Sequence, residues 1–300
     1  MKFAIYIPTY KNRYSNFLKY CNTICDKFDI YICLSTYDDH INEYDNYNFD
    51  KRITILKNDG ETIGSKNQQV FDYLYENGYT HVLLVEDDVL PIAHKITEET
   101  KRTTSNSYKK IKCDFIELIN KMIDTCEKYD ATFVSPLWPF SLGFQKPNKL
   151  NINKGINFGQ CCIYNIKYLH DNNIRFNINK IVHQDIEIVI NMLQHGLTCI
   201  TIADYEFNLV PASINEENSI LHNGTNTQDL MRLDLYKRYR DGINLRIGKH
   251  GELRMICRLN RFFNTFDLFI KGDDYHNKMY ELCCNNDVEG VKDLIRGFKS

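Results

Sequence analysis

Apolar runs of strand length alternate with amphipathic helical segments along much of this sequence, and this alternation limits the folds that the chain can adopt. The first four strand-like runs are residues 2–7, 30–34, 52–56 and 81–85. Helical periodicity appears between the first and second runs and again between the third and fourth. Strands and helices that alternate over short connections predict a mostly parallel sheet with helices on both faces. We therefore predict a Rossmann-like α/β fold whose ligands bind beyond the carboxyl ends of the strands.

The same pattern continues after the fourth strand, with one interruption. Further elements are predicted as a helix at 114–126, strands at 131–135 and 158–164, and a helix at 184–195. Residues 94–112 are polar and lack apolar periodicity, so we predict a mobile loop or an insertion there, which could close over the site as a lid.

The last part of the chain differs from the rest, and we predict a domain boundary near residue 225. Residues 1–225 form the α/β domain in this interpretation, and residues 226–300 form a basic, mainly helical extension. Nine Lys or Arg residues stand against three Asp or Glu residues between Arg232 and Arg261. This local excess predicts either contact with nucleic-acid phosphates or a solvated basic surface.

Composition excludes several classes of protein. The 37 basic and 39 acidic residues give a net charge of -2, so any polyanionic partner must be met by a local patch. The eleven cysteines follow no zinc-binding spacing, which indicates reduced thiols in a cytosol-like compartment. No apolar stretch reaches the roughly 20 residues of a membrane span, so we expect a soluble, cytoplasmic protein.

Three consecutive carboxylates, Glu86, Asp87 and Asp88, follow the fourth predicted strand. Such acids can simply solvate a turn or cap a helix. At the ligand-binding edge of a sheet, however, their mutual repulsion favours a hard divalent cation with oxygen ligands. We predict that Glu86 and Asp88 bind Mn²⁺ or Mg²⁺, and that Asp87 contacts the ribose or a water molecule.

The order of these motifs resembles that of GT-A fold glycosyltransferases. The matching segments are "IPTY" at the first strand, "GSKN" at the start of a helix, and "EDD" after the fourth strand. The resemblance implies that a D-x-D-type motif holds the metal and the diphosphate of a nucleotide-sugar donor. It further implies that the loop after the first strand and the residues after the second strand bind the base and ribose of that donor. Glu86 stands where the family commonly has Asp, and Gln184 stands where it usually has Glu.

Three features expected downstream of the acids occur in the same order. "NFGQC" resembles the segment that faces the donor sugar and contains Gly159; alone it would be an ordinary turn. "HQDIEIVINMLQHG" resembles the element that carries the catalytic base of inverting members, which would be Asp185; alone this residue would be a helix N-cap. "LHNGT" places His222 where many members supply a third metal ligand, although a single histidine more often has a structural role.

The donor pocket follows from the same resemblance together with the chemistry of the side chains. Tyr10 can stack on the base, and Arg13 can pair with phosphate oxygens. Trp138 and Phe140 would form an aromatic wall beside the acceptor, with core packing as the alternative. The complete set of predicted donor-binding residues is Pro8, Thr9, Tyr10, Arg13, Asp38, Lys66, Asn67, Asp87 and Gly159.

The predicted function is metal-dependent transfer of a sugar, from a UDP-linked donor, to an acceptor hydroxyl with inversion. Within the GT-A enzymes, "IPTYKNR" and "STYDDHINEYD" resemble the branch that glycosylates hydroxymethylated pyrimidines in DNA, including enzymes associated with TET-type oxygenases. This branch implies a DNA acceptor, bound through residues 232–261; a glycan or a protein is the other acceptor considered. The alternatives are a nucleotidyltransferase and an inactive binding module on the same fold.

Overall fold

The computed structural model divides the chain into two units, Met1–Pro211 and Ala212–Ser300. The structure describes residues 1–9, 24–38, 41–42, 51–60, 62–98, 108–138, 150–153, 156–179, 183–210, 225–248, 251–257 and 274–297. Each unit is treated by itself below.

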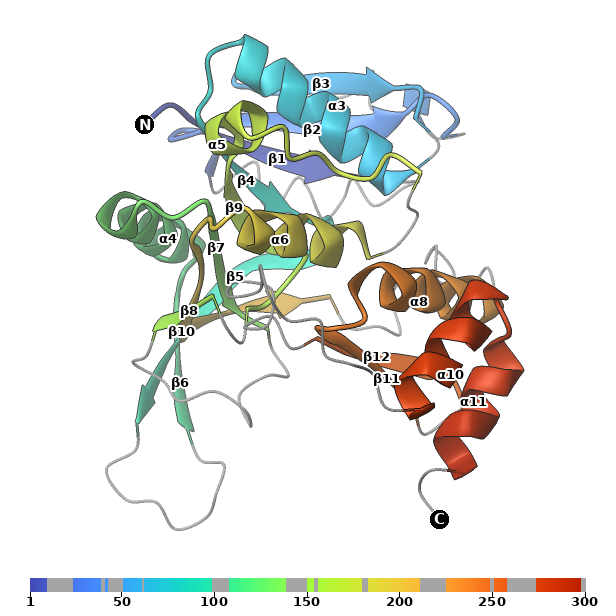
Figure 1. Cartoon of the computed structure of the whole chain (residues 1–300). Helices are drawn as coiled ribbons and strands as arrows, with labels where there is room; N and C mark the ends of the chain where they lie inside the picture. Colours follow the sequence, from blue (N-terminus) through green and yellow to red (C-terminus); the bar gives the residue numbers. More distant parts are fainter. Residues whose placement is uncertain are drawn as a thin grey trace. The chain divides into compact units, whose positions relative to one another are not determined.

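A ten-stranded mixed sheet forms the centre of the described part of the first unit (Figure 1). The strand order is β3-β2-β1-β4-β9-β7-β10-β5-β6, and β8 pairs with β10. The strands are β1 (Phe3–Pro8), β2 (Asp29–Ser35), β3 (Ile53–Asn58), β4 (His81–Val85), β5 (Val89–Glu98), β6 (Tyr108–Asp114), β7 (Phe133–Leu137), β8 (Leu150–Ile152), β9 (Cys161–Asn165) and β10 (Cys199–Leu209).

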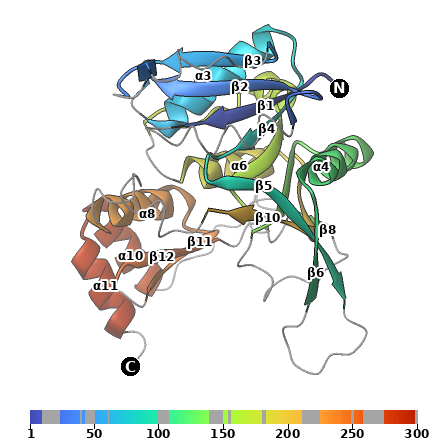
Figure 2. The same cartoon turned by 180° about the vertical axis from the view of Figure 1, so that it is seen from behind.

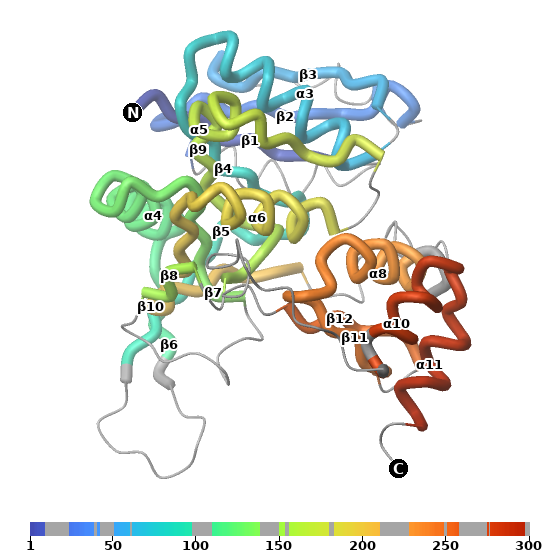
Figure 3. Tube along the Cα trace, in the orientation of Figure 1, coloured from blue at the N-terminus to red at the C-terminus, as the bar shows by residue number. Residues whose placement is uncertain are grey.

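Parallel pairing joins the first four strands, and one antiparallel strand links them to the rest. The pairs β3-β2, β2-β1 and β1-β4 are parallel, as is β7-β10. β9 runs antiparallel to both β4 and β7 and lies between them in the sheet; Figure 3 gives the trace of the chain through these strands. The beginning of β9 therefore lies at the same edge of the sheet as the carboxyl ends of β4 and β7.

Helices cover both faces of this sheet (Figures 1 and 2). α3 (Ile63–Glu76), α5 (Ile166–Asp171) and α6 (Gln184–Gln194) lie on one face, and α4 (Phe115–Tyr129) lies on the other. Along β1, Ile5 and Ile7 belong to the core cluster that includes α4, whereas the Tyr6 ring meets Phe71 of α3 at 6.4 Å between centroids. Burial on both faces explains the continuous apolar run of this strand. The predicted α/β class is confirmed.

One predicted element is wrong. Most of 94–112, expected to be a mobile loop, belongs to the hairpin of β5 and β6 in the ranges that the structure describes, 94–98 and 108–112. β6 is an edge strand with exposed Lys110, Ile111 and Lys112. Exposed lysines protect an edge from further strand pairing, and they hide the alternation by which a half-buried strand is recognised.

The second unit contains three helices and a β-hairpin within its described residues. These are α8 (Thr225–Tyr239), β11 (Ile243–Ile247), β12 (Leu253–Cys257), α10 (Asp274–Cys284) and α11 (Val288–Gly297). Buried Asp229 joins them, because its carboxylate accepts the N–H of Leu253 at 3.0 Å and contacts Lys292 Nζ at 3.3 Å. Within the described ranges of both units, no helix has the length and apolar character needed to span a bilayer.

Candidate active site

A tight turn carries the three predicted acids at the carboxyl end of β4. The N–H of Val89 donates to the carbonyl of Glu86 at 3.0 Å and closes the turn. The N–H of Glu86 donates to the carbonyl of Gln160 at 2.8 Å, which ties the turn to the start of β9. Asp87 is buried, and Glu86 and Asp88 are half-buried. We call residues 86–88 the acidic turn.

The end of β1 is bonded to this acidic turn. Thr9 Oγ1 donates to Asp87 Oδ2 at 2.8 Å, and both residues are buried. Lys66 Nζ donates to the carbonyl of Thr9 at 3.5 Å. Burial lowers the pKa of Lys66, and nearby Cys33, Asp38 and Asp87 oppose that shift. A buried ammonium group therefore lies among the acids that follow β2 and β4.

Helix α3 is held in place by its first turn. Thr62 and Ser65 form a capping box, in which the Thr62 hydroxyl accepts the N–H of Ser65 at 3.0 Å. Tyr6 donates from its hydroxyl to Asn67 Oδ1 at 2.9 Å inside the core. Asn67 thus fixes the helix against β1, so its described contact is a structural one.

Gly159 and Asp185 lie against each other on the other side of the acidic turn. Gly159 has a φ of +90°, and a Cβ built there would lie 3.1 Å from Asp185 Oδ2. Asp185 begins α6 together with Gln184, after His183, which has a left-handed φ of 65°. The structure therefore brings together two residues that sequence resemblance had placed at the donor sugar and at the reacting hydroxyl.

Burial and crowding shift the protonation of these acids. Burial holds the pKa of Glu86 well above its ordinary value, and the carboxylates of Asp88, Asp185 and Asp87 add to the shift. Burial also raises the pKa of Asp185 to about 6, although backbone N–H groups stabilise its charged form. Mutual repulsion among these carboxylates is the condition that a bound cation relieves.

One polar residue of the site, Gln160, has a role that sequence reasoning missed, and it connects the acidic turn to Trp138. Gln160 donates from Nε2 to Asp88 Oδ2 at 3.2 Å, and its Oε1 accepts the indole N–H of Trp138 at 2.8 Å. Its main chain also binds Glu86, so Gln160 holds the acidic turn at two points. The only sequence signal was its position directly after Gly159. Trp138 had been considered as an acceptor wall, without this connection.

Some of the predicted site residues lie within the described ranges and others lie outside them. Pro8 ends β1 in a buried position, and Asp38 is buried after β2 near Lys66. Tyr10, Arg13, Phe140 and His222 lie outside the described residues. Within the described ranges, no group of three or more His, Cys, Asp or Glu side chains is arranged to hold a metal ion.

Part of the basic charge counted after residue 232 is neutralised locally. Arg246 is exposed on β11. Three other arginines form ion pairs, Arg232 with Asp229, Arg238 with Asp234, and Arg254 with Glu252. Asp234 and Glu252 are already among the three acids counted above, so Asp229 is the one additional acid in these three pairs that lowers the local excess of positive charge.

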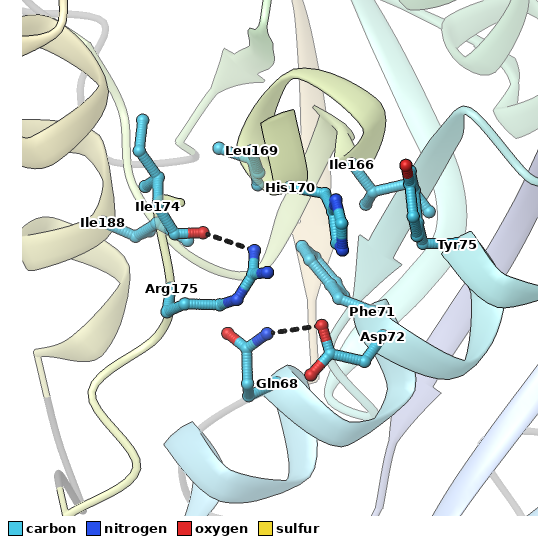
Figure 4. A pocket seen from close by; sticks show the side chains of 10 residues that line it. All are labelled: Gln68, Phe71, Asp72, Tyr75, Ile166, Leu169, His170, Ile174, Arg175 and Ile188. Atoms are coloured by element: carbon cyan, nitrogen blue, oxygen red, sulfur yellow. Dashed lines mark hydrogen bonds between the residues drawn. The ribbon is translucent and has the colours of Figure 1, made fainter. Parts of the chain in front are cut away.

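A small pocket lies apart from the acidic turn, between α3, α5 and α6 (Figure 4). The rings of Tyr75 and His170 stack on one side of it, with centroids 3.7 Å apart. Gln68 Nε2 donates to Asp72 Oδ1 at 2.9 Å on another side. None of the acids of the candidate active site lines this pocket. We regard it as a small gap in the packing between α3, which carries Lys66, and α6, which carries Asp185.

Comparison with known proteins agrees with this geometry. Residues 3–215 match the TET-associated glycosyltransferase family. No curated protein sequence matches the chain. Among solved structures, TarS residues 1–349 of S. aureus in complex with UDP-GlcNAc is similar with a TM-score of 0.53 at 10% identity, over 100% of this chain and 92% of that chain. The mannosyltransferase PcManGT from Pyrobaculum calidifontis, in complex with GDP-Man and Mn²⁺, gives 0.52 at 14% identity, over 80% and 65%. At identities this low, the structural similarity establishes a shared fold and nothing more specific.

Proposed function

The chain belongs to the TET-associated glycosyltransferase family, and we propose that it transfers a sugar from a UDP-linked donor to an acceptor hydroxyl with inversion, assisted by a divalent cation. It is a glycosyltransferase that uses a nucleotide sugar; the cation, the stereochemistry and the acceptor are the proposed parts. The family match sets aside the nucleotidyltransferase and the inactive module considered from the sequence. The observation that carries the proposal is the crowding of Asp185 against the acidic turn at the carboxyl end of β4.

The donor side of the site is formed by the ends of β1 and β2 and by α3. Lys66 offers a buried cation for the diphosphate, and Thr9 orients Asp87. Asp38, with Tyr10 and Arg13, completes the proposed pocket for the base and ribose. Gly159 is proposed to face the sugar, and a Cβ there would lie 3.1 Å from Asp185 Oδ2, which is tighter than ordinary contact.

The acidic turn fits a hard cation such as Mn²⁺ or Mg²⁺, because its crowded carboxylates are oxygen donors that repel one another. Glu86 and Asp88 would hold the ion, and His222 is the proposed third ligand. When bound, the ion would stabilise the negative charge of the departing diphosphate.

Asp185 is proposed as the general base. The acceptor oxygen attacks the anomeric carbon from the face opposite the diphosphate, and the bond between that carbon and the phosphate oxygen breaks. The proton of the acceptor hydroxyl passes to the Asp185 carboxylate. Positioned proton transfer of this kind contributes about 10² to 10⁴-fold in rate.

The acceptor is proposed to be a hydroxymethylated pyrimidine in DNA. The family name and the basic residues between 232 and 261 support it, and Arg246, which is exposed, is one residue that would contact a phosphate. Transfer of radiolabelled sugar to an oligonucleotide with one 5-hydroxymethylcytosine tests this directly. The matched control is the same oligonucleotide with cytosine. Equal labelling of both, or labelling of neither, would contradict the acceptor.

Thermal shift measurements test donor and cation binding. A ligand that binds only the folded state raises the unfolding midpoint. We expect UDP with Mn²⁺ to stabilise the wild type and to lose this effect in Asp88→Ala. Asp124→Ala is the matched control, since Asp124 is exposed on α4. Equal shifts in all three proteins would remove Asp88 from the site. Asp185→Asn should retain the shift and lose transfer.

A further inference from the structure

Trp138 is an exposed aromatic residue at the working edge of the sheet. It directly follows β7, and 43% of its surface is accessible. β7 is parallel to β4, because both are antiparallel to β9 that lies between them. Trp138 therefore lies at the same edge as the acidic turn. It is also the only tryptophan in the chain.

A hydrogen bond from the indole N–H holds the ring of Trp138 in its orientation. Its N–H donates to Gln160 Oε1 at 2.8 Å, and Gln160 Nε2 donates to Asp88 Oδ2 at 3.2 Å. Two hydrogen bonds thus connect the ring to the acidic turn. Leaving a large apolar ring partly in water forgoes about 25 cal/mol of stabilisation per Å² of accessible surface. A ring that is both exposed and held in one orientation is suited to receive another flat group.

The strand order indicates whether the donor or the acceptor would stack on Trp138. The proposed donor pocket lies on β1, β2 and α3, on one side of β4. Trp138 lies on β7, on the opposite side of β4 and beyond β9. The acceptor must approach from this second side, because the first is taken by the nucleotide.

We propose that Trp138 is a stacking platform for the nucleobase that bears the acceptor hydroxyl. This inference rests on the proposed function and deepens it. Stacking on an aromatic side chain accepts any base face, so the platform holds the base while other groups select it. Gln160 acts as a positioning residue, because it orients the indole and the acidic turn together.

The fluorescence of the single tryptophan tests the stacking without any turnover. Wild-type protein with UDP and Mn²⁺ is titrated with a single-stranded oligonucleotide that carries one 5-hydroxymethylcytosine. We expect saturable quenching of the tryptophan emission, and none with an oligonucleotide of the same length that is abasic at that position. Unchanged emission, or equal quenching by both oligonucleotides, would overturn the platform. The thermal shift given by UDP and Mn²⁺ is read on the same samples, so a failure of donor binding is recognised separately.

Substitutions provide a second measurement. Trp138→Ala should raise the KM for the oligonucleotide about tenfold or more, and Trp138→Phe should recover most of that loss. Tyr73→Ala is the control, because Tyr73 is an exposed aromatic residue of α3 with 37% accessibility. An unchanged KM in Trp138→Ala, or an equal rise in Tyr73→Ala, would contradict the role of Trp138.

Discussion

Thr9 Oγ1 donates a hydrogen bond of 2.8 Å to Asp87 Oδ2 and so joins the ends of two adjacent parallel strands. Both residues are buried, with accessibilities of 3% and 5%. A hydrogen bond to a charged acceptor in such a position contributes more than one at the surface. This contact therefore both stabilises the sheet edge and orients the acid that is proposed to face the ribose.

Thr9→Val keeps the shape of the side chain and removes this donor. We expect a loss of about 1 to 3 kcal/mol in the free energy of unfolding and weaker binding of UDP. Urea denaturation and calorimetric titration measure the two effects. Thr36→Val is the matched control, because the Thr36 hydroxyl also donates to a carboxylate, Asp59 Oδ1 at 2.8 Å, but at an exposed position. An equal loss of stability in Thr36→Val and Thr9→Val would contradict a larger contribution from the buried hydrogen bond.

Gly159→Ala should impair the site through two separate effects. Its φ of +90° disfavours any side chain, and the new methyl group would lie 3.1 Å from Asp185 Oδ2. Gly196→Ala isolates the first effect, since Gly196 has a φ of +73° and nothing within 4 Å of a built Cβ. We expect both variants to lose about 1 kcal/mol of stability from backbone strain. Only Gly159→Ala should also lose transferase activity, and similar activity in the two variants would contradict the close approach.

Asp185→Asn should yield a protein that is inactive and more stable at neutral pH. Burial raises the pKa of Asp185 to about 6, above the ordinary carboxyl value of 3.8, so the folded state binds this proton more tightly than the unfolded state does. The contribution of this group to stability is therefore greatest at low pH and is lost as pH rises from about 4 to about 6.

Removing the charge should raise the free energy of unfolding by about 1 to 3 kcal/mol at pH 7. Urea denaturation at several pH values measures it, and the advantage of Asp185→Asn over the wild type should shrink at pH 4. In the wild type the rate of transfer should also fall below about pH 6, where the base becomes protonated. A constant difference in stability across this range would exclude the proposed titration.

Lys110→Met should destabilise the hairpin of β5 and β6. Lys110 Nζ lies 2.5 Å from Glu206 Oε1, and Glu206 is 1% exposed. Removing the cation leaves a buried carboxylate without its ammonium partner, with His94 Nδ1 at 4.0 Å as its remaining described contact of this kind. Because Lys110 is 38% exposed, solvent screens part of the interaction, and we expect a loss of about 2 kcal/mol.

Lys112→Met is the matched control, since Lys112 is exposed two residues along the same strand. Chemical denaturation should place it within about 0.5 kcal/mol of the wild type. Equal stability of the two variants would refute a contribution from the buried pair.

The parallel half of the sheet could be predicted from the sequence because its strands are buried on both faces and leave uninterrupted apolar runs. Helices α4 and α6 were visible through their apolar periodicity. β6 was missed because an edge strand buries few side chains, so its sequence lacks the apolar alternation that identifies a strand. Gln160 was missed for another reason: its partners Trp138 and Asp88 are 22 and 72 residues away, and local patterns do not reveal such pairs.

The antiparallel insertion of β9 has a consequence for how the enzyme is made. The strands β1 to β4 all come from residues 3–85 and pair with one another, so we expect this half to assemble early during synthesis on the ribosome. Glu86 acquires its main-chain bond to Gln160 only after the later segment has emerged. A nascent chain can thus form the proposed nucleotide-binding half of the sheet before the acidic turn is anchored, and the site is complete only after both β9 and α6, which carries Asp185, have been translated.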